Sequence, residues 1–361
     1  MLSIETAAFH YPFVFLEEDS STVEINLELE KPLPCSTQPQ ESGFYRPGRI
    51  HFARDGHHPL ELVLYHNPAT ARFIYLHEQP ADAHLLRIVG LKETLPAERM
   101  ITLPGQLCLG AARTAVIGEA IQGLFTAPPL QESLRQYTQE QIAVFPIARE
   151  GLKYQIAEAL FTTQGYYCDE ILLDAHHVFD HTVPLYNRKV EMTLFKDKDL
   201  EPAQRNAVKV AIIGDSIASG LVMREVIEHI RRRFPALERV EVIAPLATVR
   251  GLTRLTRTSF NGSIPVRAHV FETLLNALPP DYYYSAHFNI PELHIRPDLE
   301  HAYRQWWGMD AAGQWIADTA CAGYGWSEVF YSPRKQIQMI NEELHRRHGM
   351  TLAEILRRNL Q

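Results

Sequence analysis

The chain has 361 residues, of which 46% are hydrophobic, and it carries a formal net charge of −8. A chain of this length can bury a substantial core and is expected to fold as two or three domains. The charges are spread along the sequence without a basic tract or an acidic tail, which argues against nucleic acid as a partner.

The first residues, MLSIETAAFHYP, lack the basic and apolar segments of a secretory signal. No window approaches the ~18 apolar residues that a membrane span needs. The four cysteines contain no CxxC pair, which disfavours a zinc ribbon or a disulfide framework. The sequence therefore predicts a soluble, cytoplasmic protein with reduced thiols and no membrane partner.

The N-terminal third has the patterns of β-strands. Apolar and polar residues alternate over residues 21–29, as in a strand with one solvated face. The segment Asn67-Pro-Ala-Thr70 resembles a hairpin turn between two strands. Further strands are expected at residues 62–65, 72–76, 85–89 and 100–103. We predict that residues 1–107 form a β-rich N-terminal domain.

The hydrophobic pattern then changes to that of alternating helices and strands. Residues 110–125 offer an apolar stripe at helical spacing and are followed by two prolines. A buried strand is expected at residues 142–145, followed by the loop PIAREG (146–151) and a helix over residues 152–161. This is a strand, loop and helix unit.

A second such unit, residues 209–230, contains the densest functional signal. Four apolar residues end at Gly214-Asp215-Ser216, and a helical pattern begins at Val222. Such a loop leaves backbone N–H groups at the start of the helix without internal partners, so they can bind a phosphate or an oxyanion. Asp215, Ser216 and Ser219 are the polar side chains of this loop.

Two further stretches, together with this loop, resemble the uracil phosphoribosyltransferases, which have the type I phosphoribosyltransferase fold. IAVFPIAREGLKYQIAEAL (142–160) is similar to the family stretch in which a strand runs into PILRAGL and a helix. VEVIAPLATVRGL (240–252) resembles the family's next strand and its AAPEGI turn. The three motifs follow one another in the family's order.

The resemblance implies an α/β fold with a parallel-sheet core in residues 108–308, between the β-rich domain and a C-terminal helical extension, 309–361. It implies a homodimeric transferase that uses phosphoribosyl diphosphate (PRPP) with Mg²⁺, and no metal ligand is assigned to the protein itself. Asp215 is implied as the catalytic residue that accepts from a ribose hydroxyl. The implied PRPP-binding residues are Arg149, Glu150, Gly151, Ser216, Ile217, Ala218, Ser219, Gly220 and Leu221.

The chain departs from the family in ways that bear on substrate and activity. Relatives carry an acidic pair where this chain has Gly214 and Asp215, so one carboxylate remains. The glycine-rich run that holds uracil is absent, and DYYYSAHFNIPEL (281–293) stands near its place. We therefore expect a nitrogen acceptor other than uracil. A non-catalytic protein of this fold that binds or senses a phosphorylated ligand is the alternative.

A third hypothesis comes from another enzyme class. The GDS motif at residues 214–216 resembles that of SGNH (GDSL) esterases, in which Ser216 would be the nucleophile and His301 of the DLEH segment (298–301) the base. However, the chain lacks the GxND motif of that family, and another α/β unit precedes the GDS strand.

Two remaining segments carry simpler expectations. DAHHVFDH (174–181) offers imidazole and carboxylate groups that suit Zn²⁺ or Fe²⁺, but a solvated histidine-rich loop over the active site is the favoured interpretation. Near the C-terminus, residues 333–347 form a charged amphipathic pattern that ends at Gly349. A capping box, Thr351 to Glu354, predicts a last helix.

Overall fold

The computed structural model describes the chain except for residues 1–8, 15–21, 30–42, 46, 53–59, 76, 81–82, 92–99, 104–106, 183–187, 198–199, 256–263, 276–292, 295, 317–330 and 361. Most of the DYYYSAHFNIPEL segment therefore lies outside the described residues. The strands are β1 (Phe9–Val14), β2 (Thr22–Leu29), β3 (Gly43–Tyr45), β4 (Pro47–Phe52), β5 (Leu60–His66), β6 (His77–Pro80), β7 (Met100–Leu103), β8 (Ile142–Ala148), β9 (Asp169–Glu170), β10 (Leu173–Phe179), β11 (Arg188–Phe195), β12 (Val210–Gly214), β13 (Arg239–Ile243), β14 (Ala247–Thr248), β15 (Val266–Phe271), β16 (Thr273–Leu275) and β17 (Leu293–His294).

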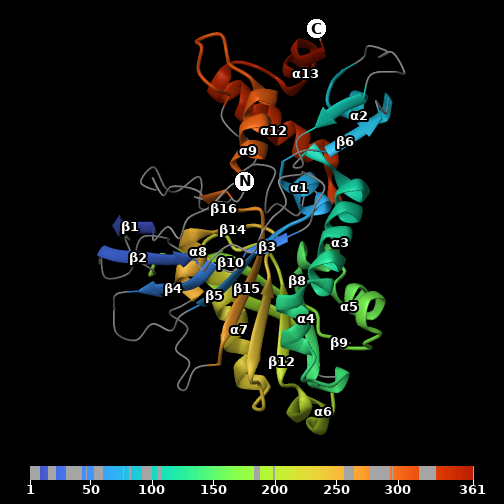
Figure 1. Cartoon of the computed structure of the whole chain (residues 1–361), viewed down its shortest axis with the longest axis vertical. Coiled ribbons are helices and arrows are strands. Elements are labelled where there is room, and N and C mark those ends of the chain that lie inside the picture. Colours follow the sequence, from blue (N-terminus) through green and yellow to red (C-terminus); the bar gives the residue numbers. More distant parts are fainter. Residues whose placement is uncertain are drawn as a thin grey trace.

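The helices of the described residues are α1 (Pro68–Ile74), α2 (Ala83–Ile88), α3 (Gly110–Thr126), α4 (Pro128–Leu134), α5 (Ile156–Gln164), α6 (Pro202–Ala207), α7 (Leu221–Arg233), α8 (Val249–Leu255), α9 (Pro297–Trp307), α12 (Pro333–His348) and α13 (Leu352–Leu360). Helices α9, α12 and α13 gather at the top of Figure 1, and the main sheet lies below them.

One mixed sheet organises the molecule. Its strand order is β1-β2-β4-β5-β15-β13-β12-β8-β10-β11, and its centre, from β5 to β10, is parallel. The flanking strands on both sides are antiparallel. The predicted α/β class with a parallel core is therefore confirmed.

The sheet has a point where the direction of winding reverses. After β8 the chain adds β10 on one side of it, then returns to add β12 on the other side. In open α/β sheets, ligands bind outside the carboxyl ends of the strands at such a switch point. Helix α6 precedes β12 and lies at the bottom of Figure 1, so β12 runs upward and its carboxyl end faces the C-terminal helices.

Apolar residues of the central strands alternate between two cores, because successive side chains of a strand point to opposite faces. Val144 of β8 and Ile212 of β12 belong to the core that includes α3 and α5. Phe145 and Ile213 belong to the core that includes α7. The strand β12 is buried on both faces, as its uninterrupted apolar sequence predicts.

Two predicted strands of the N-terminal third are wrong. Residues 72–76 lie mainly in α1, and residues 85–89 lie mainly in α2. The expected turn at Asn67 is instead a helix N-cap: the Asn67 side chain accepts from the Thr70 backbone at 2.8 Å, and the Asn67 backbone donates to the Thr70 hydroxyl at 2.7 Å. This reciprocal capping, with Pro68 in the first turn, starts a helix.

Other predicted elements are confirmed, but the expected domain boundary does not separate two sheets. Strand β2 and the strand at residues 100–103 are present, and so are the helices at 110–126, 221–233 and 333–348. Strand β5 from the N-terminal third pairs in parallel with β15. Strands of residues 1–107 thus extend the main sheet, and the division at residues 107 and 308 stays a prediction.

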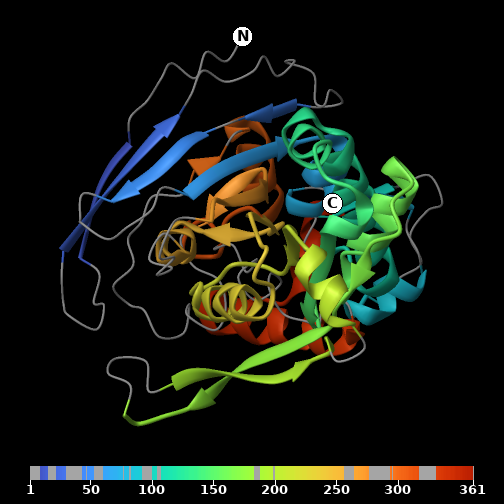
Figure 2. The ribbon, with the colours of Figure 1, turned by 90° about the horizontal axis from the view of Figure 1, so that it is seen from below.

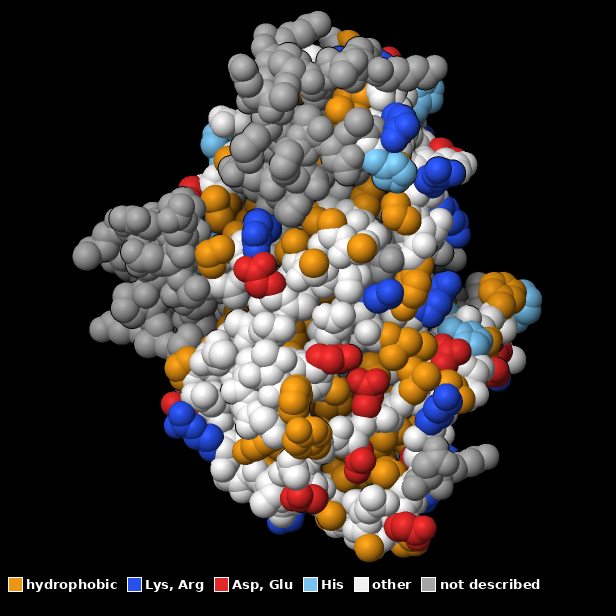
Figure 3. Space-filling view, turned by 90° about the vertical axis from the view of Figure 1, so that its right-hand side faces the viewer, with side chains coloured by type: hydrophobic (Ala, Val, Ile, Leu, Met, Phe, Trp, Pro, Cys, Tyr) orange, Lys and Arg blue, Asp and Glu red, His pale blue; other side chains and the backbone are white. Residues whose placement is uncertain are grey.

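The surface that carries α3, α4 and α5 is mixed in character. Figure 3 shows acidic, basic and apolar side chains interspersed over it, as on an ordinary solvated face. Among the described helices, none is both long and apolar enough to cross a membrane.

Candidate functional site

The loops that follow β8 and β12 meet at the switch point. Gly151 packs against Gly214 so closely that a Cβ atom on Gly151 would lie 2.1 Å from the Gly214 carbonyl oxygen. A Cβ atom on Gly214 would lie 2.5 Å from the Cδ1 methyl group of the buried Ile156 side chain. Glycine is therefore required at position 151, where the nearest atom is backbone, and this contact brings Arg149 and Glu150 to the same edge as Asp215.

The loop after β12 is fixed by the segment that follows β13. Thr248 donates its hydroxyl to the Ala218 carbonyl at 2.6 Å, and Arg254 donates to the Ser219 carbonyl. Gly220 has φ +75°, and a Cβ atom there would lie 2.5 Å from the Gly251 carbonyl. Glycine is needed at this position for both reasons, and the loop enters α7 in a single defined path.

The backbone N–H groups of this loop divide into two sets. Ile217 donates its N–H to the Leu246 carbonyl at 2.9 Å, and Leu221 donates to the Ser219 hydroxyl at 3.3 Å. The N–H groups of Ala218, Ser219 and Gly220 have no acceptor among the described residues. They precede the first turn of α7, a helix of 13 residues, where the helix dipole favours an anion.

A polar cluster lies where the two loops touch. Glu150 is 5% exposed, and its Oε1 accepts from the Tyr154 hydroxyl at 2.5 Å and from the Ser216 hydroxyl at 2.7 Å. The hydroxyl oxygens of Tyr154 and Ser216 are also 3.0 Å apart. Asp215 accepts from the Ser216 backbone at 3.0 Å. Ser216 thus connects two carboxyl groups that come from different loops.

The two carboxyl groups affect each other's ionisation. Burial raises the pKa of Glu150, although hydrogen bonds from Tyr154 and Ser216 and the charge of Arg113 oppose this. Burial, with the nearby Glu150 carboxylate, raises the pKa of Asp215 well above its usual value. Each carboxyl therefore holds its proton to a higher pH than an exposed one does, and a cation entering the site would favour their ionised forms.

The cations of the site lie at its rim. Arg149 is exposed, and Lys153, four residues later at the end of a single 3₁₀ turn, is half-buried. Both follow the carboxyl end of β8, beside the glycine contact. The site therefore combines carboxyl groups inside with cationic side chains and free N–H groups around them.

Comparisons with known proteins give similarity in structure only. No protein-family model matches the chain, and no curated protein matches its sequence. A solved hypoxanthine phosphoribosyltransferase from Staphylococcus aureus matches with 14% identity over 50% of this chain and 90% of that one, at a TM-score of 0.29. An adenine phosphoribosyltransferase from Trypanosoma brucei was solved with AMP, pyrophosphate and ribose 5-phosphate. It matches with 11% identity over 64% of this chain and 88% of that one, at a TM-score of 0.35.

A hypoxanthine phosphoribosyltransferase from Trypanosoma cruzi matches with 13% identity over 54% of this chain and 93% of that one, at a TM-score of 0.26. None of these three proteins is a uracil phosphoribosyltransferase. The likeness assigns no activity and no ligand to this chain.

The serine and histidine of the esterase hypothesis are not brought together. The Ser216 hydroxyl contacts Glu150 and Tyr154. His301 is an exposed residue of α9, and its Nε2 lies 2.7 Å from the Gln305 side chain. Asp298, the aspartate of the DLEH segment, is paired with Arg296. Among the contacts of the described residues, none joins Ser216 to His301, so the esterase hypothesis gains no support from the structure.

The histidine-rich segment is part of an arm, not of a loop. Residues 173–179 form β10, which pairs with β8 only at Leu173 and Asp174 and continues beyond it beside β11. Figure 2 shows this two-stranded arm projecting from the body. Among the described residues, no group of three or more His, Cys, Asp or Glu side chains is placed to hold a metal ion.

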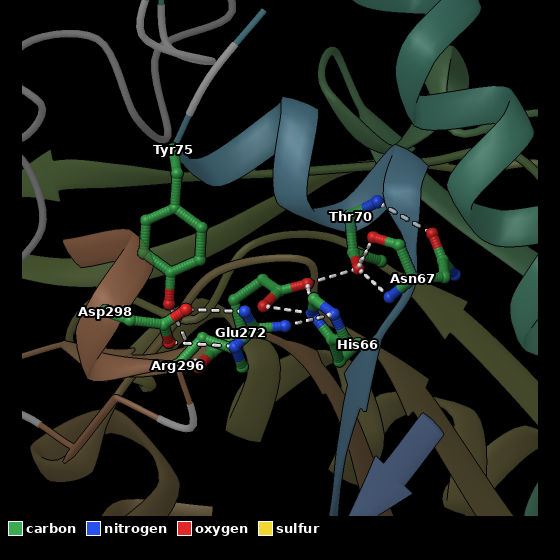
Figure 4. A network of polar contacts seen from close by, with 7 residues as sticks. All are labelled: His66, Asn67, Thr70, Tyr75, Glu272, Arg296 and Asp298. Carbon is green, nitrogen blue, oxygen red and sulfur yellow. Dashed lines mark hydrogen bonds and ion pairs between the residues drawn. The ribbon is translucent and has the colours of Figure 1, made fainter. Parts of the chain in front are cut away.

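A second polar network at the same sheet edge was not predicted from the sequence (Figure 4). Glu272, fully buried directly after β15, accepts from His66 at 2.9 Å and from the Thr70 hydroxyl. Arg296, 4% exposed, lies with Nη1 3.2 Å from His66 Nε2 and forms a forked pair with Asp298 at the start of α9.

One tautomer of His66 satisfies both of its contacts. Because arginine only donates, this is the tautomer in which Nε2 accepts from Arg296 and Nδ1 donates to Glu272. Glu272 also has φ +61°, an unusual backbone conformation for a residue with a side chain. The network attaches the start of α9 to β5 and β15. The short motif Arg296-Pro-Asp298 predicts a helix start, but nothing in it indicates the partners.

Proposed function

We propose that this chain is a phosphoribosyltransferase that uses PRPP with Mg²⁺ and transfers the phosphoribosyl group to a nitrogen acceptor other than uracil. The observation that supports this most is the contact of Gly151 with Gly214, because it joins the two loops to which we assign the anion and brings the carboxyl groups of Glu150 and Asp215 together at the switch point. Homodimer formation and the expected cytoplasmic location remain part of the proposal.

Each part of PRPP has a counterpart in the site. The free N–H groups of Ala218, Ser219 and Gly220, with the first turn of α7, would hold the 5′-phosphate. Asp215 would accept from a ribose hydroxyl. Arg149 would contact the diphosphate, since a guanidinium matches phosphate oxygens with two parallel hydrogen bonds.

The carboxyl oxygens of the site suit Mg²⁺ that is bound together with the phosphates of a substrate. Mg²⁺ prefers oxygen ligands and is commonly held by one or two carboxylates plus substrate phosphates. Asp215 and Glu150 provide two carboxyl groups near one another. When bound, the metal would neutralise charge on the leaving diphosphate, while Asp215 would orient the ribose as the C1–O bond breaks and a C1–N bond forms.

A non-catalytic ligand-binding protein is the second candidate. The Ser216 and Tyr154 hydroxyls are both bound to Glu150, and Ile217 donates its N–H internally. A site whose polar groups satisfy one another is suited to holding a ligand without turnover.

Thermal denaturation tests the proposal. PRPP with Mg²⁺ should raise the melting temperature, and Mg²⁺ alone should not. Release of diphosphate with a panel of nitrogen acceptors then separates the transferase from the binding protein. No stabilisation by PRPP at millimolar concentration would remove the transferase and any non-catalytic binding of PRPP.

A further inference from the structure

Tyr331 connects the C-terminal part of the chain to the loop after β8. It lies two residues before α12, and its hydroxyl donates a hydrogen bond to the Arg149 carbonyl oxygen at 2.9 Å. The Tyr331 side chain is 47% exposed, so its ring borders solvent as well as the loop. A segment 182 residues away in the sequence therefore contacts the rim of the candidate site.

The same ring holds a cation of the loop. The Lys153 ammonium nitrogen lies 4.4 Å from the centroid of the Tyr331 ring. This is within the range of a cation–π interaction, in which the negative face of the ring attracts the charge. Tyr331 thus contacts both ends of the short turn from Arg149 to Lys153, one through its hydroxyl and one through its ring.

We propose that Tyr331 is a positioning residue that holds Arg149 and Lys153 together as a two-cation site for a diphosphate group. This inference rests on the proposed function and adds a residue from outside the resembling motifs. A lysine side chain has four rotatable bonds, and fixing it on binding costs conformational entropy. A ring that already holds the ammonium reduces this cost, so the loop is prepared for its anion.

The pairing of the two side chains suits a dianionic or more highly charged group with two phosphorus centres. Arginine offers a planar fork of N–H donors to one phosphate, and lysine offers a compact charge that can serve a second. The buried side of the loop carries Glu150, so an anion would approach from the rim where Arg149 and Lys153 lie.

The test is calorimetric titration with inorganic diphosphate and Mg²⁺, and separately with Mg²⁺ and PRPP. Tyr331→Leu removes the ring face and should weaken diphosphate binding by about three- to tenfold, whereas Tyr331→Phe, which keeps the ring, should recover most of the loss. Lys153→Met should weaken binding by at least as much. In the double variant, Tyr331→Leu should cost less than it does alone, because the part of its effect that passes through the lysine is already lost.

Matched controls exist elsewhere on the surface. Tyr167 is 74% exposed and lies on the connection between α5 and β9, so Tyr167→Leu should leave binding unchanged. Lys209 pairs with Glu238 at the opposite edge of the sheet, so Lys209→Met should also have no effect.

The outcomes separate the inference from the proposed function. Either of two results would overturn the role of Tyr331 and leave the transferase proposal intact. One is that the wild type and Tyr331→Leu bind diphosphate with the same affinity. The other is that the losses of affinity in the double variant are additive. If the wild type binds diphosphate with this pattern but does not bind PRPP, the role of Tyr331 stands and the transferase proposal falls. If it binds neither, both are wrong.

Discussion

Gly151 lies against the carbonyl of Gly214, and no side chain can be placed between them. Gly151→Ala should destabilise the fold by about 1–3 kcal/mol, because the nearest atom is backbone and the two loops must separate. Urea denaturation measures this. In Gly118→Ala the new methyl group meets only the movable end of Gln155, so this control in α3 should be neutral or stabilising. Equal effects of the two substitutions would contradict the described contact.

The raised pKa values of Asp215 and Glu150 predict how stability depends on pH. Between their ordinary values, 3.8 and 4.5, and their raised values, the folded state binds more protons than the unfolded state. The free energy of unfolding should therefore fall as pH rises through this window. Asp215→Asn removes one of these groups, so its stability should fall less with pH.

Urea denaturation from about pH 4 to about pH 8 would show this difference. Glu238→Gln is a control of opposite sign, since a hydrogen bond from Lys209 lowers the pKa of Glu238. The Glu238→Gln variant should be less stable than the wild type above the ordinary glutamate pKa, because it lacks the ionised carboxylate that pairs with Lys209. Parallel curves for wild type and Asp215→Asn would show that Asp215 titrates normally.

The sequence predicted the elements that carry the site because their signals are local. Apolar residues followed by Gly214 indicate a buried strand and a loop, and the apolar stripe of α7 follows directly. By contrast, Arg72-Phe-Ile-Tyr-Leu76 has the β-branched and aromatic residues typical of a strand, yet it is mostly helical. There, the N-cap that Asn67 provides to the Thr70 backbone N–H and the packing of Phe73 outweigh strand propensity.

The contacts between distant residues could not be predicted in this way. Glu150 was assigned to the site by its position in a motif, but its burial beneath Ser216 depends on how two loops meet. His66 contacts Glu272 over 206 residues of sequence and Arg296 over 230. Each is a single polar residue in its own segment, and only the fold brings them together.

The buried network predicts a stability effect at the start of α9. Arg296→Met removes the donor that lies against the buried His66 Nε2 and breaks the pair with the half-exposed Asp298, which should cost about 1–3 kcal/mol. Arg304, on the same helix, forms a solvent-exposed pair with Glu300, so Arg304→Met should change stability by less than about 1 kcal/mol. Urea denaturation compares the two variants. A neutral Arg296→Met would mean that the network does not hold α9 to the sheet.

Binding of PRPP with Mg²⁺ should release protons. The carboxyl groups of Asp215 and Glu150 have raised pKa values in the free protein, and a cation nearby would lower them. Affinity should therefore increase as pH rises. Calorimetry in buffers of different ionisation enthalpy counts the protons released, and Asp215→Asn should release fewer than the wild type. An identical count for both would show that Asp215 does not ionise on binding.

The most direct test of the account is calorimetric titration of PRPP with Mg²⁺ onto wild type, Asp215→Asn and Ser216→Ala. Asp215→Asn keeps the shape of the protonated side chain but removes a charge-assisted hydrogen bond to the ribose, so affinity should fall by about one to two orders of magnitude. Ser216→Ala should reduce affinity by about fivefold or less, because a neutral hydrogen bond contributes about 1 kcal/mol. Failure of the wild type to bind PRPP, or equal affinity of wild type and Asp215→Asn, would contradict the proposed role of this loop.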